Sequence, residues 1–161
     1  SKLAKATMEQ AAKVANGVEE RFRAEALAAV ALGYAKAGMP TEAGEKVVQL
    51  EESARALEEP RAKAEALAAA ADVHIQIDHK DEALKLLEEA AVAAKSVERS
   101  ESRAYALLAV AEITAAVGNT KKALALLKEA DKSADKVADP EQQKIVVAKV
   151  RSTMAELEKK K

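Results

Sequence analysis

A repeat of 40 residues runs through this chain and constrains its fold more than any other feature. The pair Ala26-Leu27 recurs as Ala66-Leu67 and again as Ala106-Leu107. Another position carries alanine in all three copies: Ala43, Ala83 and Ala123. Self-similarity at a fixed period of this size is typical of solenoids, in which each structural unit stacks on its neighbours alone. We therefore expect three segments that fold alike and pack in a row.

The composition favours helices. Hydrophobic residues make up 49% of the 161 residues but aromatic residues only 2%, so alanine carries much of the apolar content. Alanine has the highest helix propensity, and its small side chain lets helix axes approach closely. A chain of this length can bury the core of one domain. These features together predict one alanine-rich, all-α domain.

Charge and cysteine content exclude several classes of function. The 26 basic and 27 acidic residues nearly cancel, and a formal net charge of −1 provides no long-range attraction for nucleic acid or an anionic membrane. The absence of cysteine excludes disulfides and thiolate metal sites. No apolar run approaches the roughly 18 residues of a membrane span, and the first residues lack the apolar segment of a signal peptide. We expect no membrane or nucleic-acid partner, and a cytoplasmic location is favoured.

Apolar residues recur with helical spacing along almost the whole chain. One example advances in steps of four and three residues, which places all its members on one helix face: Ala43, Val47, Leu50, Ala54 and Leu57. Turn-forming segments such as Gly38-Met39-Pro40 and Gly118-Asn119-Thr120 separate these stretches. The expected helices cover residues 2–17, 20–37, 40–58, 60–77, 80–98, 100–117, 120–138 and 140–159. Because the connections are short, neighbouring helices should be antiparallel.

The pattern within each unit resembles the tetratricopeptide repeat, a helix–turn–helix motif. In the first unit the matching residues are Leu27, Val30, Ala31, Tyr34, Gly38, Ala43 and Val47. The chain differs by having leucine where the family has a tryptophan, and a 40-residue period in place of about 34. The resemblance implies a right-handed α-solenoid of antiparallel helix hairpins within a single domain, 1–161. It would comprise a half unit (1–20), three full units (21–60, 61–100 and 101–140) and a closing helix (141–161).

The resemblance also implies a concave groove lined by the first helix of each unit, the surface that binds peptides in this family. The candidate groove residues are Glu25, Leu32, Lys36, Glu65, Asp72, Ile75, Gln76, Tyr105, Leu108 and Glu112. An apolar strip bordered by carboxylates could receive a protein or peptide partner such as an amphipathic basic helix. The alternative is that the charges solvate an ordinary surface and that the apolar groups pack between repeats.

No residue pattern indicates catalysis, a metal site or a cofactor. The chain has no glycine-rich phosphate loop and no serine nucleophile elbow. Its two histidines, His74 and His79, lie five residues apart and not on one helix face. His74 occupies the repeat position of Tyr34 and Thr114, so we expect it to pack in the core. Adjacent glutamates point in different directions on a helix and are expected to be solvated.

Two functions remain open at this point. The first is a non-enzymatic module that presents its concave groove to a protein or peptide. The second is a structural repeat scaffold, natural or engineered, that provides stability or self-assembly without a dedicated ligand. The outer faces of the first and last helices carry polar residues, including Lys2, Lys5, Glu141 and Lys144. Since polar end faces oppose end-to-end stacking, we expect a monomer or a weak homo-dimer.

Overall fold

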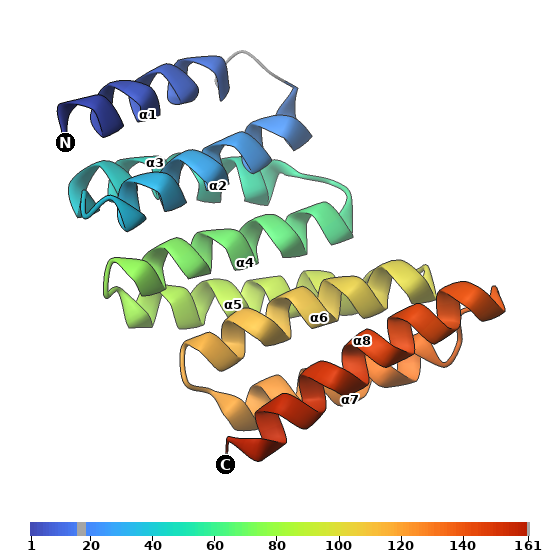
Figure 1. Ribbon diagram of the computed structural model, residues 1–161. Helices are drawn as coiled ribbons and strands as arrows, with labels where there is room; N and C mark the ends of the chain where they lie inside the picture. The colour runs from blue at the N-terminus through green and yellow to red at the C-terminus, as the bar shows by residue number, and fades with distance from the viewer. Residues whose placement is uncertain (16–18, 161) are drawn as a thin grey trace.

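The computed structural model of the chain describes residues 1–15 and 19–160, and within these ranges it contains eight α-helices and no strand (Figure 1). The helices are α1 (Lys2–Ala15), α2 (Glu20–Lys36), α3 (Pro40–Ala56), α4 (Pro60–Gln76), α5 (Lys80–Lys95), α6 (Ser100–Ala116), α7 (Thr120–Ala134) and α8 (Pro140–Lys159). The predicted all-α fold is confirmed. The expected end of the first helix, at residue 17, lies outside the described residues.

The helices begin where the sequence predicts, but several end earlier. Capping explains the starts of α4 and α8, since the Asp139 carboxylate accepts a hydrogen bond of 2.8 Å from the backbone N–H of Gln142 and Pro140 follows it. The largest difference is at α7, which ends at Ala134 rather than at residue 138. Beyond Ala134 the chain continues in tighter turns, in which the N–H groups of Lys136 and Val137 donate to carbonyls three residues back, those of Ser133 and Ala134.

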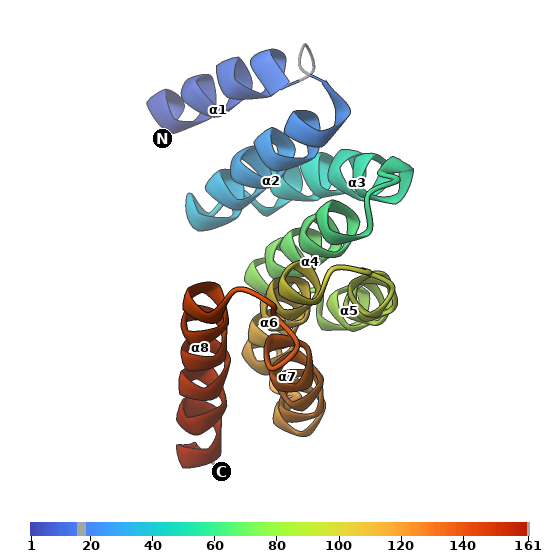
Figure 2. The same cartoon turned by 90° about the vertical axis from the view of Figure 1, so that its right-hand side faces the viewer.

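The helices stack as antiparallel hairpins in two layers. Helices α2, α4, α6 and α8 lie side by side in the inner layer, and α3, α5 and α7 form the outer layer behind them (Figures 1 and 2). Helix α1 packs against α2 at one end of the stack. The chain winds in a right-handed sense, and the inner layer lines a shallow concave face between α1 and α8 (Figure 2). This is the expected right-handed α-solenoid.

The core repeats with the sequence. The alanines at the two closest positions of each hairpin are fully buried: Ala31, Ala71, Ala111, Ala43, Ala83 and Ala123. Leu27, Leu67 and Leu107 are each 1% exposed and fill the space between the helices. Burying one such leucine stabilises the fold by about 1.5–3 kcal/mol. Small residues thus set the distance between helices and leucines provide most of the apolar contact.

The hairpin turns share a left-handed backbone position. Gly38 has a φ of 73° and Gly118 a φ of 94°. The equivalent residue of the middle unit is Asp78, with a φ of 64°. Glycine adopts this conformation without strain and aspartate tolerates it better than most residues, so all three units turn alike. Within the described ranges, no helix is both long and apolar enough to cross a bilayer.

Candidate functional site

A hollow of the concave face lies between the N-terminal halves of α2 and α4. Its volume is about 700 Å³, and two of the predicted groove residues, Glu25 and Glu65, line it. Its apolar floor consists of Leu57 and five alanines: Ala24, Ala28, Ala62, Ala66 and Ala69. We call this hollow the α2/α4 groove. Because alanine side chains are short, a partner could approach the two helices closely here.

Charged and aromatic side chains surround the α2/α4 groove. The guanidinium of Arg21 lies 4.4 Å from the ring centroid of Phe22, whose side chain is 44% exposed. Nε of Arg61 donates a 2.9 Å hydrogen bond to Oε1 of Glu65, one turn further along α4. The carboxylate of Glu59 accepts hydrogen bonds from the first backbone N–H groups of α4. With Glu25, three carboxylates and two guanidinium groups border the groove, which leaves it slightly acidic.

The corresponding space between α4 and α6, here called the α4/α6 groove, holds an aromatic side chain of the protein itself. Tyr105 occupies the repeat position of Glu65, and its half-buried ring packs against the core. The guanidinium of Arg61 lies 5.3 Å from the ring centroid, and the Lys149 ammonium of α8 lies 5.7 Å from it. The alanines beneath are closed off as well, with Ala68 3% exposed and Ala106 fully buried.

One residue that was predicted to line the groove is buried instead. Leu108 is 3% exposed, so its side chain is not presented to a ligand and the prediction for this residue is wrong. Leu108 belongs to the buried core cluster of the protein, and its helix α6 packs against α4, α5, α7 and α8. Leu32 and Ile75 are half-buried against the core, as the alternative interpretation of the apolar groups expects.

The remaining predicted residues are spread along the inner helices. Lys36 is exposed in the last turn of α2, and Asp72 accepts a 3.3 Å hydrogen bond from Gln76 on its own helix. Glu112 lines a separate hollow of about 350 Å³ between the C-terminal ends of α6 and α8. The structure therefore brings Glu25 and Glu65 into one groove but leaves the other candidates apart.

The predicted set lacked most residues of the α2/α4 groove, including Arg21, Phe22 and Arg61, and it also lacked Lys149 beside Tyr105. A signal for two of them was present, because Arg21 and Arg61 are separated by the 40-residue period and each precedes a groove glutamate by four residues. That spacing places arginine and glutamate on the same helix face. The contribution of Lys149 depends on where α8 packs, which the repeat pattern does not specify.

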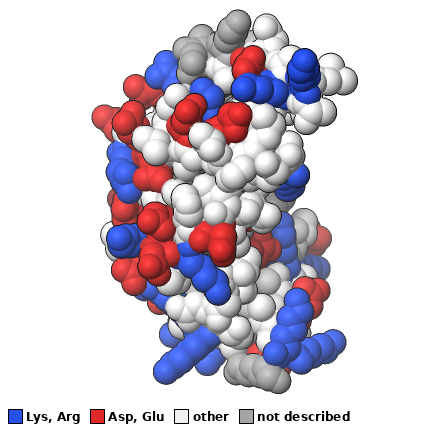
Figure 3. All heavy atoms as spheres, turned by 90° about the vertical axis from the view of Figure 1, so that its left-hand side faces the viewer, with Lys and Arg blue, Asp and Glu red and all other residues white. Residues whose placement is uncertain are grey.

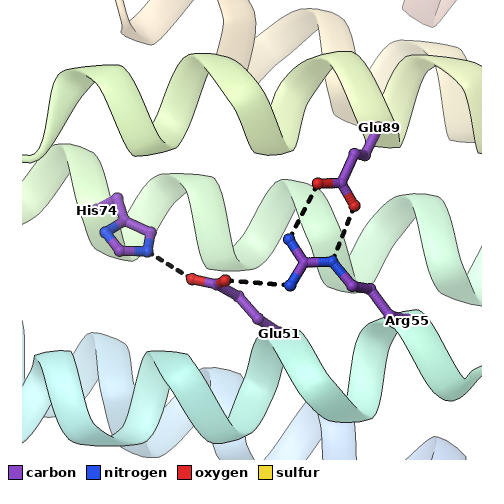
Figure 4. Close-up of polar contacts among 4 residues, drawn as sticks. All are labelled: Glu51, Arg55, His74 and Glu89. Atoms are coloured by element: carbon purple, nitrogen blue, oxygen red, sulfur yellow. Dashed lines mark hydrogen bonds and ion pairs between the residues drawn. The ribbon is translucent and has the colours of Figure 1, made fainter.

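The outer layer carries a polar network of a different kind (Figure 4). Arg55 of α3 binds Glu89 of α5 through two hydrogen bonds of 2.9 Å, and its third contact is Glu51 at 3.4 Å. The hydrogen bonds to Glu89 raise the pKa of Arg55, and the hydrogen bonds from Arg55 lower the pKa of Glu89. Both groups are therefore charged at neutral pH, and the pair joins two successive repeats.

The same bridge recurs one repeat later. Lys95 of α5 lies 3.3 Å from Glu129 of α7, and these residues are the repeat equivalents of Arg55 and Glu89. Figure 3 shows the opposite ends of these outer helices, where acidic and basic side chains are intermixed along the left margin. The outer layer thus carries exposed ion pairs between repeats, whereas the α2/α4 groove of the inner layer has an apolar floor.

His74 is buried, as predicted, but it also forms a polar link. It is 6% exposed, and its Nε2 lies 2.7 Å from Oε1 of Glu51 on α3 (Figure 4). The ring of His79 lies 5.6 Å from that of His74. Among the residues that the structure describes, no group of three or more histidine, aspartate or glutamate side chains is placed to hold a metal ion.

Comparison with known proteins bears on the fold alone. No protein-family model and no curated protein sequence matches the chain. Among solved structures, the crystal structure of Ton1535 from Thermococcus onnurineus NA1 is similar, with a TM-score of 0.60 and 20% sequence identity. The similarity covers 91% of this chain but 43% of Ton1535, so the chain spans less than half the length of that protein. At this identity the likeness supports a shared architecture.

Proposed function

We propose that this chain is a non-enzymatic, tetratricopeptide-repeat-like binding module whose α2/α4 groove receives a segment of a protein partner. The observation that supports the proposal is the hollow of about 700 Å³ on the concave face, with its alanine floor and charged border. Neighbouring units have the same backbone arrangement, yet the α4/α6 groove is filled by Tyr105. An open groove beside a filled one is a feature that packing alone does not require.

An amphipathic helix with basic residues is the partner that this groove fits best. Helix-in-groove recognition needs an apolar floor and room for the partner's backbone, and the alanines of α2 and α4 provide both. Glu25, Glu59 and Glu65 outnumber Arg21 and Arg61 around the groove, so basic side chains are favoured over acidic ones. Because the chain as a whole is nearly neutral, the charged residues at the border of the groove determine this preference for basic side chains.

A displayed library of random peptides, selected on the immobilised chain, tests the proposal. Selected peptides should carry lysine or arginine and should lose binding to Ala69→Arg, which places a long side chain across the groove floor. Ala125→Arg is the matched control, because Ala125 is exposed on the outer helix α7. Thermal melts establish that both variants are folded. Failure to enrich any peptide, or equal binding of selected peptides to Ala69→Arg, would contradict the proposal.

A structural scaffold is the second candidate, and the ion pairs between outer helices favour it. The Arg55–Glu89 and Lys95–Glu129 bridges join successive repeats on the side away from the groove. In a scaffold, the chain's role would be to hold a fixed shape or to assemble. Light scattering distinguishes the two, because a self-assembling scaffold grows with concentration whereas a binding module of this kind stays a monomer or weak dimer.

A further inference from the structure

The two grooves of the inner layer have the same frame and differ in what fills them. In the α4/α6 groove, the ring of Tyr105 is half-buried against the core, with the guanidinium of Arg61 5.3 Å from its centroid. One repeat earlier, Arg21 takes the place of Arg61 and Glu65 takes the place of Tyr105. Most of the alanines are shared between the two grooves, although Ala62 corresponds to Ser102, and the space between α2 and α4 is open.

We infer that the α2/α4 groove is a subsite for an aromatic side chain, which a basic partner helix inserts where the repeat's own tyrosine is missing. The inference rests on the proposed binding function and specifies the residue that anchors the partner. The chain itself provides the basis, because one repeat later a tyrosine, Tyr105, occupies the equivalent place between the inner helices α4 and α6. The neighbouring carboxylates, Glu25 and Glu65, would pair with basic residues beside the anchor.

The chemistry of the groove fits an aromatic ring better than an aliphatic chain. A flat ring buries a large area over a smooth alanine floor at a small cost in conformational entropy. Arg21 and Phe22 already stand at the border, so a ring entering the groove meets both a cation and an exposed aromatic edge. Arginine–aromatic and aromatic–aromatic contacts both add to the burial of apolar area.

A matched peptide series provides the test. The probes are lysine-containing, alanine-based helices of about 18 residues, long enough to be helical, with Tyr, Leu or Ala at one central position. Titration calorimetry should show that the Tyr peptide binds the chain at least about tenfold more tightly than the Ala peptide and more tightly than the Leu peptide. The Glu65→Tyr variant, which rebuilds the Tyr105 arrangement inside the groove, should reduce that preference to about onefold.

Glu45→Tyr is the control variant, because Glu45 is exposed on the outer helix α3. It should keep the full preference for the Tyr peptide. Equal binding of the three peptides, or a Tyr preference that survives in Glu65→Tyr, would overturn the aromatic subsite and leave the binding function in place. If neither these helices nor any library peptide binds the intact chain, the proposed binding function itself is wrong.

Discussion

The α2/α4 and α4/α6 grooves have the same backbone arrangement but differ in how much of their surface is accessible. In the first, Ala66 is 9% exposed on the floor of an open hollow, whereas its repeat equivalent Ala106 is fully buried. The exchange of Glu65 for Tyr105, together with the contact of Lys149 from α8, distinguishes them. In a repeat protein the period therefore determines the backbone arrangement, and the side chains that differ between units determine whether the space between two units is available.

We expect the largest loss of stability from a substitution in α4, the helix shared by both grooves. Leu67 of α4 is 1% exposed, and Leu67→Ala removes apolar contact and leaves a cavity, at an expected cost of about 2–5 kcal/mol in the free energy of unfolding. Thermal or urea denaturation measures the loss. Leu84→Ala is the matched control, because Leu84 is 38% exposed on α5 and should cost about 1 kcal/mol or less. Equal losses would mean that the core register described above is wrong.

Removing the tyrosine should convert the filled groove into an open one. Tyr105→Ala loses a half-buried ring and its contacts with Arg61 and Lys149, which should cost about 1–3 kcal/mol. Titration with the Tyr peptide should then give two bound peptides per chain in place of one. Phe22→Ala serves as the stability control, since Phe22 is 44% exposed. An unchanged melt and an unchanged stoichiometry would show that Tyr105 does not fill this space.

The interfaces beside the two grooves also differ in polarity. His74 of α4 contacts Glu51 of α3 at 2.7 Å, whereas its equivalent Thr114 donates to Val110 of its own helix at 2.7 Å. Glu51→Ala removes the hydrogen-bond partner of a buried imidazole and should cost about 1–2 kcal/mol. Glu52→Ala, at the exposed neighbour, should change stability by about 0.5 kcal/mol or less. Denaturant titration of both variants would sharpen the contrast, and similar losses would contradict it.

Substitutions in the ion pairs of the outer layer should have the smallest effect on stability, and this effect should depend on pH. Arg55→Met is expected to cost about 0.5–1 kcal/mol near neutral pH, since the Glu89 side chain is 43% exposed and its ion pair is screened by solvent. Hydrogen bonds from Arg55 hold the pKa of Glu89 below its usual value of 4.5, so the stabilisation is present above that pH. It is lost as the pH falls through the lowered pKa.

Urea denaturation at neutral and acidic pH measures this dependence. The difference between the wild-type chain and Arg55→Met should shrink on acidification, and Lys95→Met should show a smaller difference throughout because its pair has a longer contact of 3.3 Å. A difference that grows at low pH would reverse the assigned direction of the Glu89 pKa.

The sequence predicted the fold to the level of individual helix starts, because alanine and leucine recur with both the helical and the 40-residue period. Capping residues such as Asp139 and turn residues such as Gly38 are local signals, and local signals determine local boundaries. Asp78 turns like the two glycines even though it differs from them in type. Redundancy over three copies made the pattern robust to such exceptions.

The site was less predictable, because it depends on contacts between helices that are distant in sequence. Leu108 was expected on the surface and is buried. Tyr105 lies in the α4/α6 groove, where Arg61 of α4 and Lys149 of α8 contact its ring. The Arg55–Glu89 pair likewise joins residues 34 positions apart, a spacing that differs from the repeat period. Repeat spacing identifies which positions face inward, but the sizes of all the surrounding side chains determine which of them remain accessible.

The stacking of each inner helix on its neighbours in the row has a mechanical consequence. A small rotation at one contact between units adds to the rotations at the others, so the distance between the two ends of the stack is the softest dimension of the molecule. Stretching such a chain should separate units one at a time, since each unit is held by its own neighbours. The stack is therefore elastic along its length, and a change in the separation of α2 and α4 would also change the curvature of the molecule.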